Sequence, residues 1–225
     1  MNDSRGFSEE LFSYLRDLAE NNDKTWFEAN RNRYEEAVKV PALAFIGAFG
    51  PYLRKVSPHF QAVPSAQGGS LFRIYRDTRF SKDKTPYKTN TGLHFRHEAG
   101  RDAHAPGFYV HLAPNEVFFG AGLWQPEPPV AAAIRDLIVN EPDEWKKVKD
   151  GIGRTELKLA GDSLARPPRG YDPDHQFIDD LKRKDFLASV DLDEKAAVSP
   201  GFLNRIAGLC TDAAPLMRFL CRAVD

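Results

Sequence analysis

The chain has 225 residues, of which 42% are hydrophobic and 28% are charged, and its formal net charge is −1. This length is enough to bury one core, so we expect residues 1–225 to form a single domain. The near-neutral charge argues against a dedicated nucleic-acid coat protein, which would be strongly basic.

The first fifty residues carry helical patterns. Ser8 opens an amphipathic stretch that ends at Asn21-Asn22, and Asp23 is placed to cap a second helix. Pro41 interrupts the second helix and opens a third one. We therefore expect a helical N-terminal layer.

Strand patterns follow in the middle of the chain. Alternating hydrophobicity predicts strands at residues 71–77, 92–98, 107–112 and 116–123. Because these strands are close in sequence, they favour a mostly antiparallel sheet. Gly120 and Gly122 in the fourth strand predict a bulge, or a close approach by backbone or ligand.

The second half of the chain returns to helices. The sequence predicts helices at 126–139, 141–152 and 173–181, a last helix from Ser199 with a kink at Pro215, and short strands at 155–160 and 186–190. The proline-rich stretch 166–175 is predicted to be an irregular loop that could fold over a neighbouring element. The fold class we expect is α+β, with a central, mostly antiparallel sheet, an N-terminal helical layer and C-terminal helices.

The segment from Arg73 to Lys88 carries an excess of positive charge. Two aspartates, Asp77 and Asp83, stand against six cationic residues, which gives the segment a net charge of +4 and leaves −5 for the rest of the chain. The cations are Arg73, Arg76, Arg79, Lys82, Lys84 and Lys88. Cations this close repel one another unless a ligand or acidic neighbours neutralise them.

The same segment matches the signature R-x-x-R-D-x-R-F-x-x-D-K-x-x-Y. The matching residues are Arg73, Arg76, Asp77, Arg79, Phe80, Asp83, Lys84 and Tyr87. In this signature the chain resembles a bacterial family of about the same length, known as a domain of unknown function, which also occurs within longer fungal proteins. Two further stretches look like family features, Asn21-Asn22 with Trp26-Phe27, and Gly170-Tyr171-Asp172. The resemblance implies no activity, because the family has none to carry over.

The signature favours an anion site for a phosphorylated or carboxylated small molecule, in an enzyme or a binding protein. The planar guanidinium group suits phosphate and carboxylate oxygens, which it can bind with two hydrogen bonds. In this hypothesis Asp77 orients an arginine, and Tyr87 donates a hydroxyl group or carries a proton. The anion itself is held by Arg73, Arg76, Arg79 and Lys84. The sequence identifies neither a catalytic residue nor a cofactor.

Two other interpretations of the segment stay open. In one, the protein is a nucleic-acid or protein interaction module in which Tyr75, Phe80 and Tyr87 stack on bases while the cations neutralise phosphates. In the other, the charges form a purely structural network of ion pairs. In the ligand-free protein we expect Asp77 to contact at least one of Arg73, Arg76 or Arg79 as its internal counter-ion, as its orienting role in the anion hypothesis requires.

Several other kinds of chemistry lack support in the sequence. The usual nucleotide-binding, hydrolase and zinc-protease motifs are not found. His94 and His97 would point to opposite faces of a strand, so we expect no metal site there. Cys210 and Cys221 lie eleven residues apart in one helical pattern and cannot bridge each other.

With neither a membrane-spanning run nor a signal peptide visible, we expect a cytoplasmic protein without a membrane partner.

Overall fold

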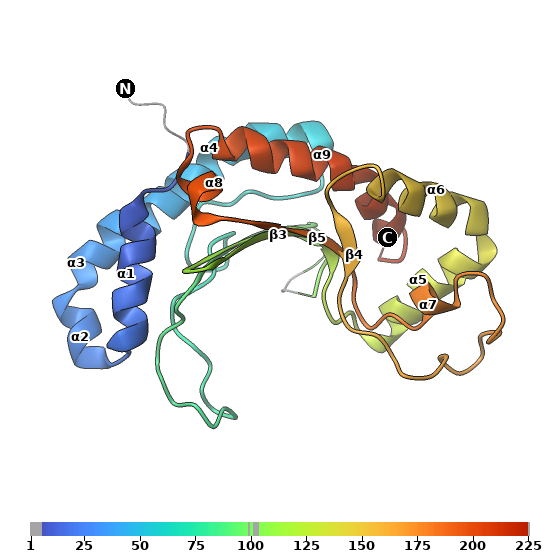
Figure 1. Cartoon of the computed structure of the whole chain (residues 1–225), viewed down its shortest axis with the longest axis horizontal. Coiled ribbons are helices and arrows are strands. Elements are labelled where there is room, and N and C mark those ends of the chain that lie inside the picture. Colours follow the sequence, from blue (N-terminus) through green and yellow to red (C-terminus); the bar gives the residue numbers. More distant parts are fainter. Residues whose placement is uncertain (1–5, 99, 101–103, 225) are drawn as a thin grey trace. The chain divides into compact units, whose positions relative to one another are not determined.

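The computed structural model describes residues 6–98, 100 and 104–224, and it shows an α+β fold (Figure 1). Five antiparallel strands form one sheet in the order β1-β2-β3-β5-β4. The strands are β1 (Thr91–Arg96), β2 (Gly107–Ala113), β3 (Glu116–Leu123), β4 (Lys158–Ala160) and β5 (Phe186–Leu192). In the last pair, Leu159 of β4 lies opposite Ala188 of β5. The fold class predicted from the sequence is confirmed.

Helices precede and follow the sheet in the sequence. They are α1 (Glu9–Glu20), α2 (Lys24–Ala29), α3 (Arg31–Tyr34), the π-helix η1 (Glu35–Lys39), α4 (Val40–Val56), α5 (Pro128–Asn140), α6 (Pro142–Ile152), α7 (Ile178–Leu181), α8 (Glu194–Val198) and α9 (Phe202–Cys221). No helix in the described residues is both long enough and apolar enough to cross a membrane.

The chain divides into two compact units. The first comprises Met1–Phe95, Tyr109–Phe119 and Asp191–Ala207. The second comprises Arg96–Phe108, Gly120–Val190 and Gly208–Asp225. A single domain of residues 1–225 stays a prediction.

The N-terminal helices of the first unit begin largely where the sequence predicts. Asp23 caps α2 by accepting a hydrogen bond of 3.0 Å from the backbone N–H of Trp26. Pro41 lies in the first turn of α4, which continues directly from the π-helix η1, so the irregular turn lies next to the position where proline lacks an N–H. The predicted second helix is wrong in its length, because the chain forms α2, α3 and η1 in its place.

Aromatic rings join α4 to the sheet and to the start of α9 within the first unit. The ring of Phe45 stacks on Phe7 at a centroid distance of 5.2 Å and lies 5.7 Å from Phe202. One turn further, Phe49 lies 4.7 Å from the ring of Phe95 in β1. These fully or nearly fully buried rings form the core that covers one face of the sheet.

The two faces of β2 differ in burial. Val110 and Leu112 are completely buried, whereas Tyr109 and His111, which alternate with them, keep part of their surface exposed. Because successive side chains of a strand point to opposite faces, the polar pair lies on the face that the apolar core does not cover.

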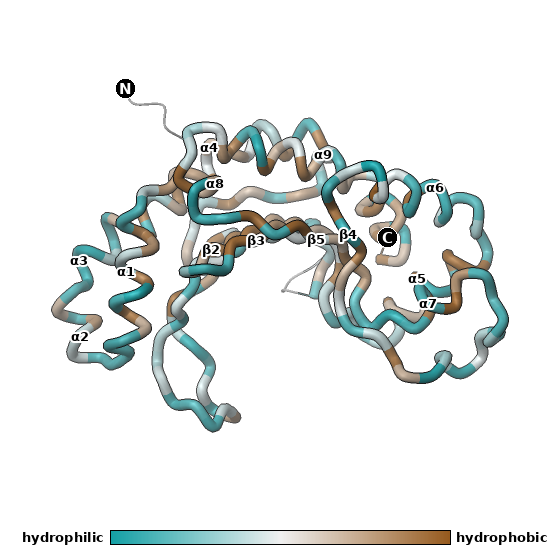
Figure 2. The backbone as a smooth tube through the Cα atoms, viewed as in Figure 1, coloured by the Kyte–Doolittle hydropathy of each residue, from teal (hydrophilic) through white to brown (hydrophobic). Residues whose placement is uncertain are grey.

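The predicted strand at residues 71–77 is wrong. Residues 71–90, which we call the arm, form a long irregular excursion with isolated antiparallel bridges at Leu71–Leu93 and Tyr75–Tyr87 (Figure 1). Between these bridges the backbone lacks a continuous ladder, so the alternating pattern is not converted into a strand. Figure 2 shows that most of the arm is hydrophilic, in contrast to β3 and β5.

The second unit contains the predicted close approach at Gly122. Its φ angle is +142°, and a Cβ atom there would lie 2.2 Å from the carbonyl oxygen of Phe186. Only glycine avoids this clash, so the prediction of a close backbone approach is confirmed. The predicted helix at 173–181 is wrong in extent, since only its last four residues form α7, and α8 was not predicted at all.

The loop at 166–175 is fastened to α5 by one tyrosine. The hydroxyl group of Tyr171 donates to a carboxylate oxygen of Asp136 at 2.9 Å. Burial and the neighbouring Asp136 raise the pKa of Tyr171 to about 12. The loop therefore covers part of α5, in agreement with the prediction that it could fold over a neighbour.

A buried carboxylate organises the helices of the second unit. Asp180 on α7 is 2% exposed and accepts hydrogen bonds from Trp145 Nε1 at 3.0 Å, Lys149 Nζ at 2.7 Å and Arg183 Nε at 3.2 Å. A buried charge is tolerated when hydrogen bonds and counter-charges satisfy it in this way. Asp180 thus ties α6 to α7 and to the residue that follows α7.

We expect Asp180→Ala to lower the free energy of unfolding by about 3 kcal/mol, because it leaves two cations and an indole N–H without their shared acceptor. The neighbouring Asp179→Ala is the matched control, since the side chain of Asp179 is 92% exposed. It should change the stability by less than about 0.5 kcal/mol. Urea unfolding of both variants measures the difference, and equal losses would contradict the role assigned to Asp180.

Candidate functional site

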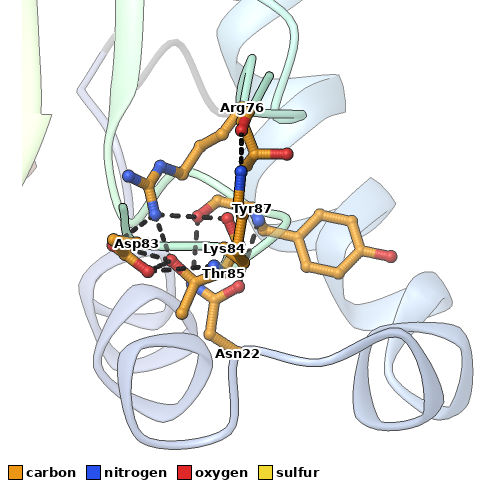
Figure 3. Close-up of polar contacts among 7 residues, drawn as sticks. Asn22, Arg76, Asp83, Lys84, Thr85 and Tyr87 are labelled. Carbon is orange, nitrogen blue, oxygen red and sulfur yellow. Dashed lines mark hydrogen bonds and ion pairs between the residues drawn. The ribbon is translucent and has the colours of Figure 1, made fainter. Parts of the chain in front are cut away.

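The arm is fastened to the N-terminal helices by the backbone of Tyr87. The side-chain amide of Asn22 donates to the Tyr87 carbonyl oxygen at 2.9 Å and accepts from the Tyr87 N–H at 3.0 Å (Figure 3). Both polar groups of this buried residue are thereby satisfied. Asn22 acts as a one-residue strand partner, sixty-five positions away in the sequence.

The aromatic side chain of Tyr87 completes this anchor. Its ring stacks on Phe27 of α2 at a centroid distance of 4.1 Å and an angle of 16°. Tyr75, its partner across the arm, lies 5.4 Å from the same ring. Burial raises the pKa of Tyr87, so its phenol group stays protonated at neutral pH. The ring points away from the polar group around Asp83 (Figure 3), which gives Tyr87 a structural role.

Arg76 closes the arm on itself. Its Nη1 atom donates to Asp83 Oδ2 at 2.5 Å, to the Thr85 carbonyl oxygen at 3.2 Å and to the Thr85 hydroxyl group (Figure 3). The backbone N–H of Arg76 donates to the carbonyl oxygen of Pro86 at 2.9 Å. The Nη1 atom of Arg76 is thus engaged in contacts within the arm.

Asp83 is held as an anion by the turn in which it lies. It accepts from the Thr85 N–H at 2.9 Å and from the Thr85 hydroxyl group at 2.9 Å. The Thr85 N–H, together with the Arg76 guanidinium, lowers the pKa of Asp83 to about 2. The residue is therefore charged at neutral pH and cancels one of the arm's positive charges.

Asp77 and Arg79 form a second local pair. Arg79 donates from Nη2 to Asp77 Oδ2 at 2.7 Å and from Nε to Oδ1 at 3.0 Å, and its backbone N–H donates to Oδ1 at 3.2 Å. These contacts with Arg79 lower the pKa of Asp77 to about 2. The prediction that Asp77 contacts a neighbouring arginine is confirmed. The Arg79 side chain stays 77% exposed, with donors left over for a ligand.

The tip of the arm exposes an aromatic ring. Phe80 is 96% exposed, and the Arg79 guanidinium lies 5.8 Å from its ring centroid. Lys84 donates from Nζ to the Thr78 carbonyl oxygen at 2.8 Å, across the turn that carries the ring. The turn is thus held by internal contacts while Phe80 faces solvent.

Arg73 and Lys88 stand apart from these pairs. Within the residues that the structure describes, neither side chain makes an ion pair or a hydrogen bond with an acidic group, and Arg73 is exposed. Lys88 Nζ lies 5.2 Å from the ring centroid of Phe72. Burial, and secondly the charge of Arg73, lower the pKa of Lys88. Two like charges therefore lie near each other in a partly desolvated place.

The structure separates the sequence-predicted site residues into groups. Arg76 and Asp83 form one local pair, Asp77 and Arg79 form another, Lys84 braces the tip, and Tyr87 anchors the arm. Arg73 alone among the six proposed residues has no hydrogen-bond partner in the described chain. Sequence reasoning missed the role of Asn22 and Phe27 as the anchor, although their stretch was noted with the signature.

Cys210 and Cys221 both lie buried in α9, with no disulfide between them, in agreement with the prediction that they cannot bridge each other. Burial raises the pKa of the Cys210 thiol, so it stays protonated. In the part of the chain that is described, no three His, Cys, Asp or Glu side chains are grouped to hold a metal ion.

One comparison places the chain in a family. The family described as "Conserved hypothetical protein (DUF2461)" matches residues 10–219, and the chain belongs to it. The resemblance to an uncharacterised family is thus confirmed, while the importance of the signature stays a prediction. Among curated proteins no match to the chain is found.

We expect Asn22→Ala to lower the free energy of unfolding by about 2 kcal/mol, because it orphans the N–H and the carbonyl group of Tyr87. Asn21→Ala is the matched control. Its amide donates only to the exposed carbonyl oxygen of Asp17 at the end of α1, so the loss should stay below about 1 kcal/mol. Urea unfolding compares the two variants. A loss at Asn21 as large as that at Asn22 would contradict the anchor.

Proposed function

We propose that the protein binds a small anion, a phosphorylated or carboxylated molecule, and that Arg73 and Lys88 make the main contacts. The observation that carries this proposal is a pair of cations that form no ion pair within the described residues, of which Lys88 is half-buried and has a lowered pKa. The carboxylate nearest to Arg73 in charge effect, Asp77, is bound to Arg79. Like charges brought together in a poorly solvated place are unfavourable without a counter-ion. An anion between them removes that cost.

The remaining charges of the arm support this arrangement. Asp77 and Asp83 each take up one arginine, so the surplus of four positive charges falls on Arg73, Lys88 and two lysines at the tip. Asp77 also fixes the orientation of the exposed Arg79 guanidinium, as an arginine that approaches a ligand requires. Arg79 and Lys84 therefore serve as additional donors for a larger anion.

A second candidate function rests on the tip. The fully exposed Phe80 ring beside Arg79 suits an interaction module that anchors a protein or nucleic-acid partner. Of the three rings that could stack on bases, Tyr87 is buried and Tyr75 packs against it, so Phe80 alone remains fully open. Because strand binders use several stacked rings, this weakens the nucleic-acid alternative more than the protein alternative.

The purely structural interpretation explains part of the segment. The contacts of Arg76 with Asp83 and Thr85 shape the arm and require no ligand. They do not explain why Arg73 and Lys88 lie near each other with no ion pair of their own in the described chain. A structural network accounts for Arg76, while Arg73 and Lys88 fit the anion hypothesis.

We expect inorganic phosphate to stabilise the protein against heat, by about 2.7 kcal/mol at a hundredfold excess over the dissociation constant. Arg73→Gln and Lys88→Gln should each remove most of this gain. Lys82→Gln, which removes an exposed charge of the same arm, is the matched control and should keep it. Melting curves with and without phosphate at constant ionic strength measure the effect. An identical response in all four proteins would refute the site.

A further inference from the structure

The open face of the sheet in the first unit lies next to the proposed anion site through Phe72. Lys88 Nζ lies over the Phe72 ring, and the same ring lies 5.8 Å from the ring of Tyr109 on β2. Tyr109 lies in turn 5.8 Å from Phe118 on β3. A row of largely buried rings, each with some exposed surface, therefore leads away from Lys88 across the sheet.

Gly92 on β1 makes room for this row. A Cβ atom on Gly92 would lie 2.6 Å from the hydroxyl oxygen of Tyr109 and 3.1 Å from the Phe72 ring. A Cβ atom there would force the end of the Tyr109 side chain to shift and the Phe72 ring to move by a few tenths of an ångström. The sheet thus accommodates both rings over the backbone of β1.

The polar groups on this face are already engaged with each other. The Tyr109 hydroxyl group and His111 Nδ1 lie 3.1 Å apart, and His111 Nε2 lies 3.8 Å from a carboxylate oxygen of Glu116. Burial lowers the pKa of His111, which is therefore neutral at pH 7. What this face presents to a ligand is ring surface.

The ring of His111 adds to that surface. It stacks on Phe118 at a centroid distance of 4.7 Å and an angle of 9°. Aromatic side chains held at such distances favour a further planar ring over an alkyl chain, because ring faces and edges attract each other beyond simple burial. An alkyl group would gain only the burial.

We propose that this row of rings, Phe72, Tyr109 and Phe118, seats the aromatic body of a ligand whose anionic group is held by Arg73 and Lys88. The inference rests on the proposed anion site and names its substrate class, an aryl phosphate or aryl carboxylate. Charge complementarity places the anionic end of the ligand at Lys88. Because Phe72 lies between Lys88 and Tyr109, the aromatic end of the ligand extends from Lys88 toward Tyr109.

Calorimetric titration with methyl phosphate and phenyl phosphate tests the proposal, since both probes carry the same anionic group. The parent protein should bind phenyl phosphate about tenfold more tightly than methyl phosphate. Phe118→Leu should reduce this ratio to about twofold or less and leave the affinity for methyl phosphate unchanged. Phe72→Leu should reduce the ratio as well, and its own affinity for methyl phosphate is the reference because Lys88 Nζ lies over this ring. Phe80→Leu removes a fully exposed ring elsewhere on the arm and should keep the tenfold ratio.

The outcomes separate the two proposals. Equal affinities for the two phosphates in the parent protein would overturn the ring seat and leave the anion site standing. Failure of both probes to bind would overturn the anion site itself. Loss of the preference in Phe80→Leu, with no effect of Phe118→Leu or Phe72→Leu, would move the ring to the tip and refute the seat on the sheet.

Discussion

The pairing of the Asn22 amide with the backbone of Tyr87 holds the arm in its place. The arm has no continuous ladder of its own, and its residues are mostly polar, so burial of apolar surface contributes little to its shape. The two hydrogen bonds with Asn22, which lies between α1 and α2, and the stack on Phe27 hold the arm in place of a continuous ladder. Without them, the charged segment would have no fixed position from which to present its cations.

Charge pairing inside the arm then decides which cations remain open. Asp77 and Asp83 are each paired with an arginine close to them in sequence, because short turns bring those groups together at a small cost in chain entropy. Arg73 and Lys88 lie at the two ends of the cationic segment and form no ion pair in the described chain. Of the surplus cations, Lys88 lies over the Phe72 ring, which in turn contacts Tyr109.

The sequence predicts the helices and strands well where one face of the element is buried and the other is exposed. Residues 116–123 were predicted as a strand and form β3, because alternation there reports a covered face and an open one. The same alternation at 71–77 gave only isolated bridges and separate backbone hydrogen bonds, such as that from Arg76 to Pro86, because a pattern states which side chains share a face and does not specify a continuous ladder. For the same reason the pattern does not predict hydrogen bonds between distant residues, such as those of Asn22 with the backbone of Tyr87. Within the site, the composition of the segment predicted the excess of positive charge. Which cations form ion pairs and which do not depends on the geometry of the turns.

The pKa of the Lys88 ammonium group tests the central claim most directly. Burial and the charge of Arg73 lower this pKa in the free protein. A phosphate ion bound between Arg73 and Lys88 must raise it, because the anion stabilises the charged form. Side-chain NMR titration of Lys88, with and without saturating phosphate, should show this rise together with a shift of the Arg73 signals. An unchanged pKa of Lys88, with phosphate shifting only the signals of Arg76 and Arg79, would contradict the account.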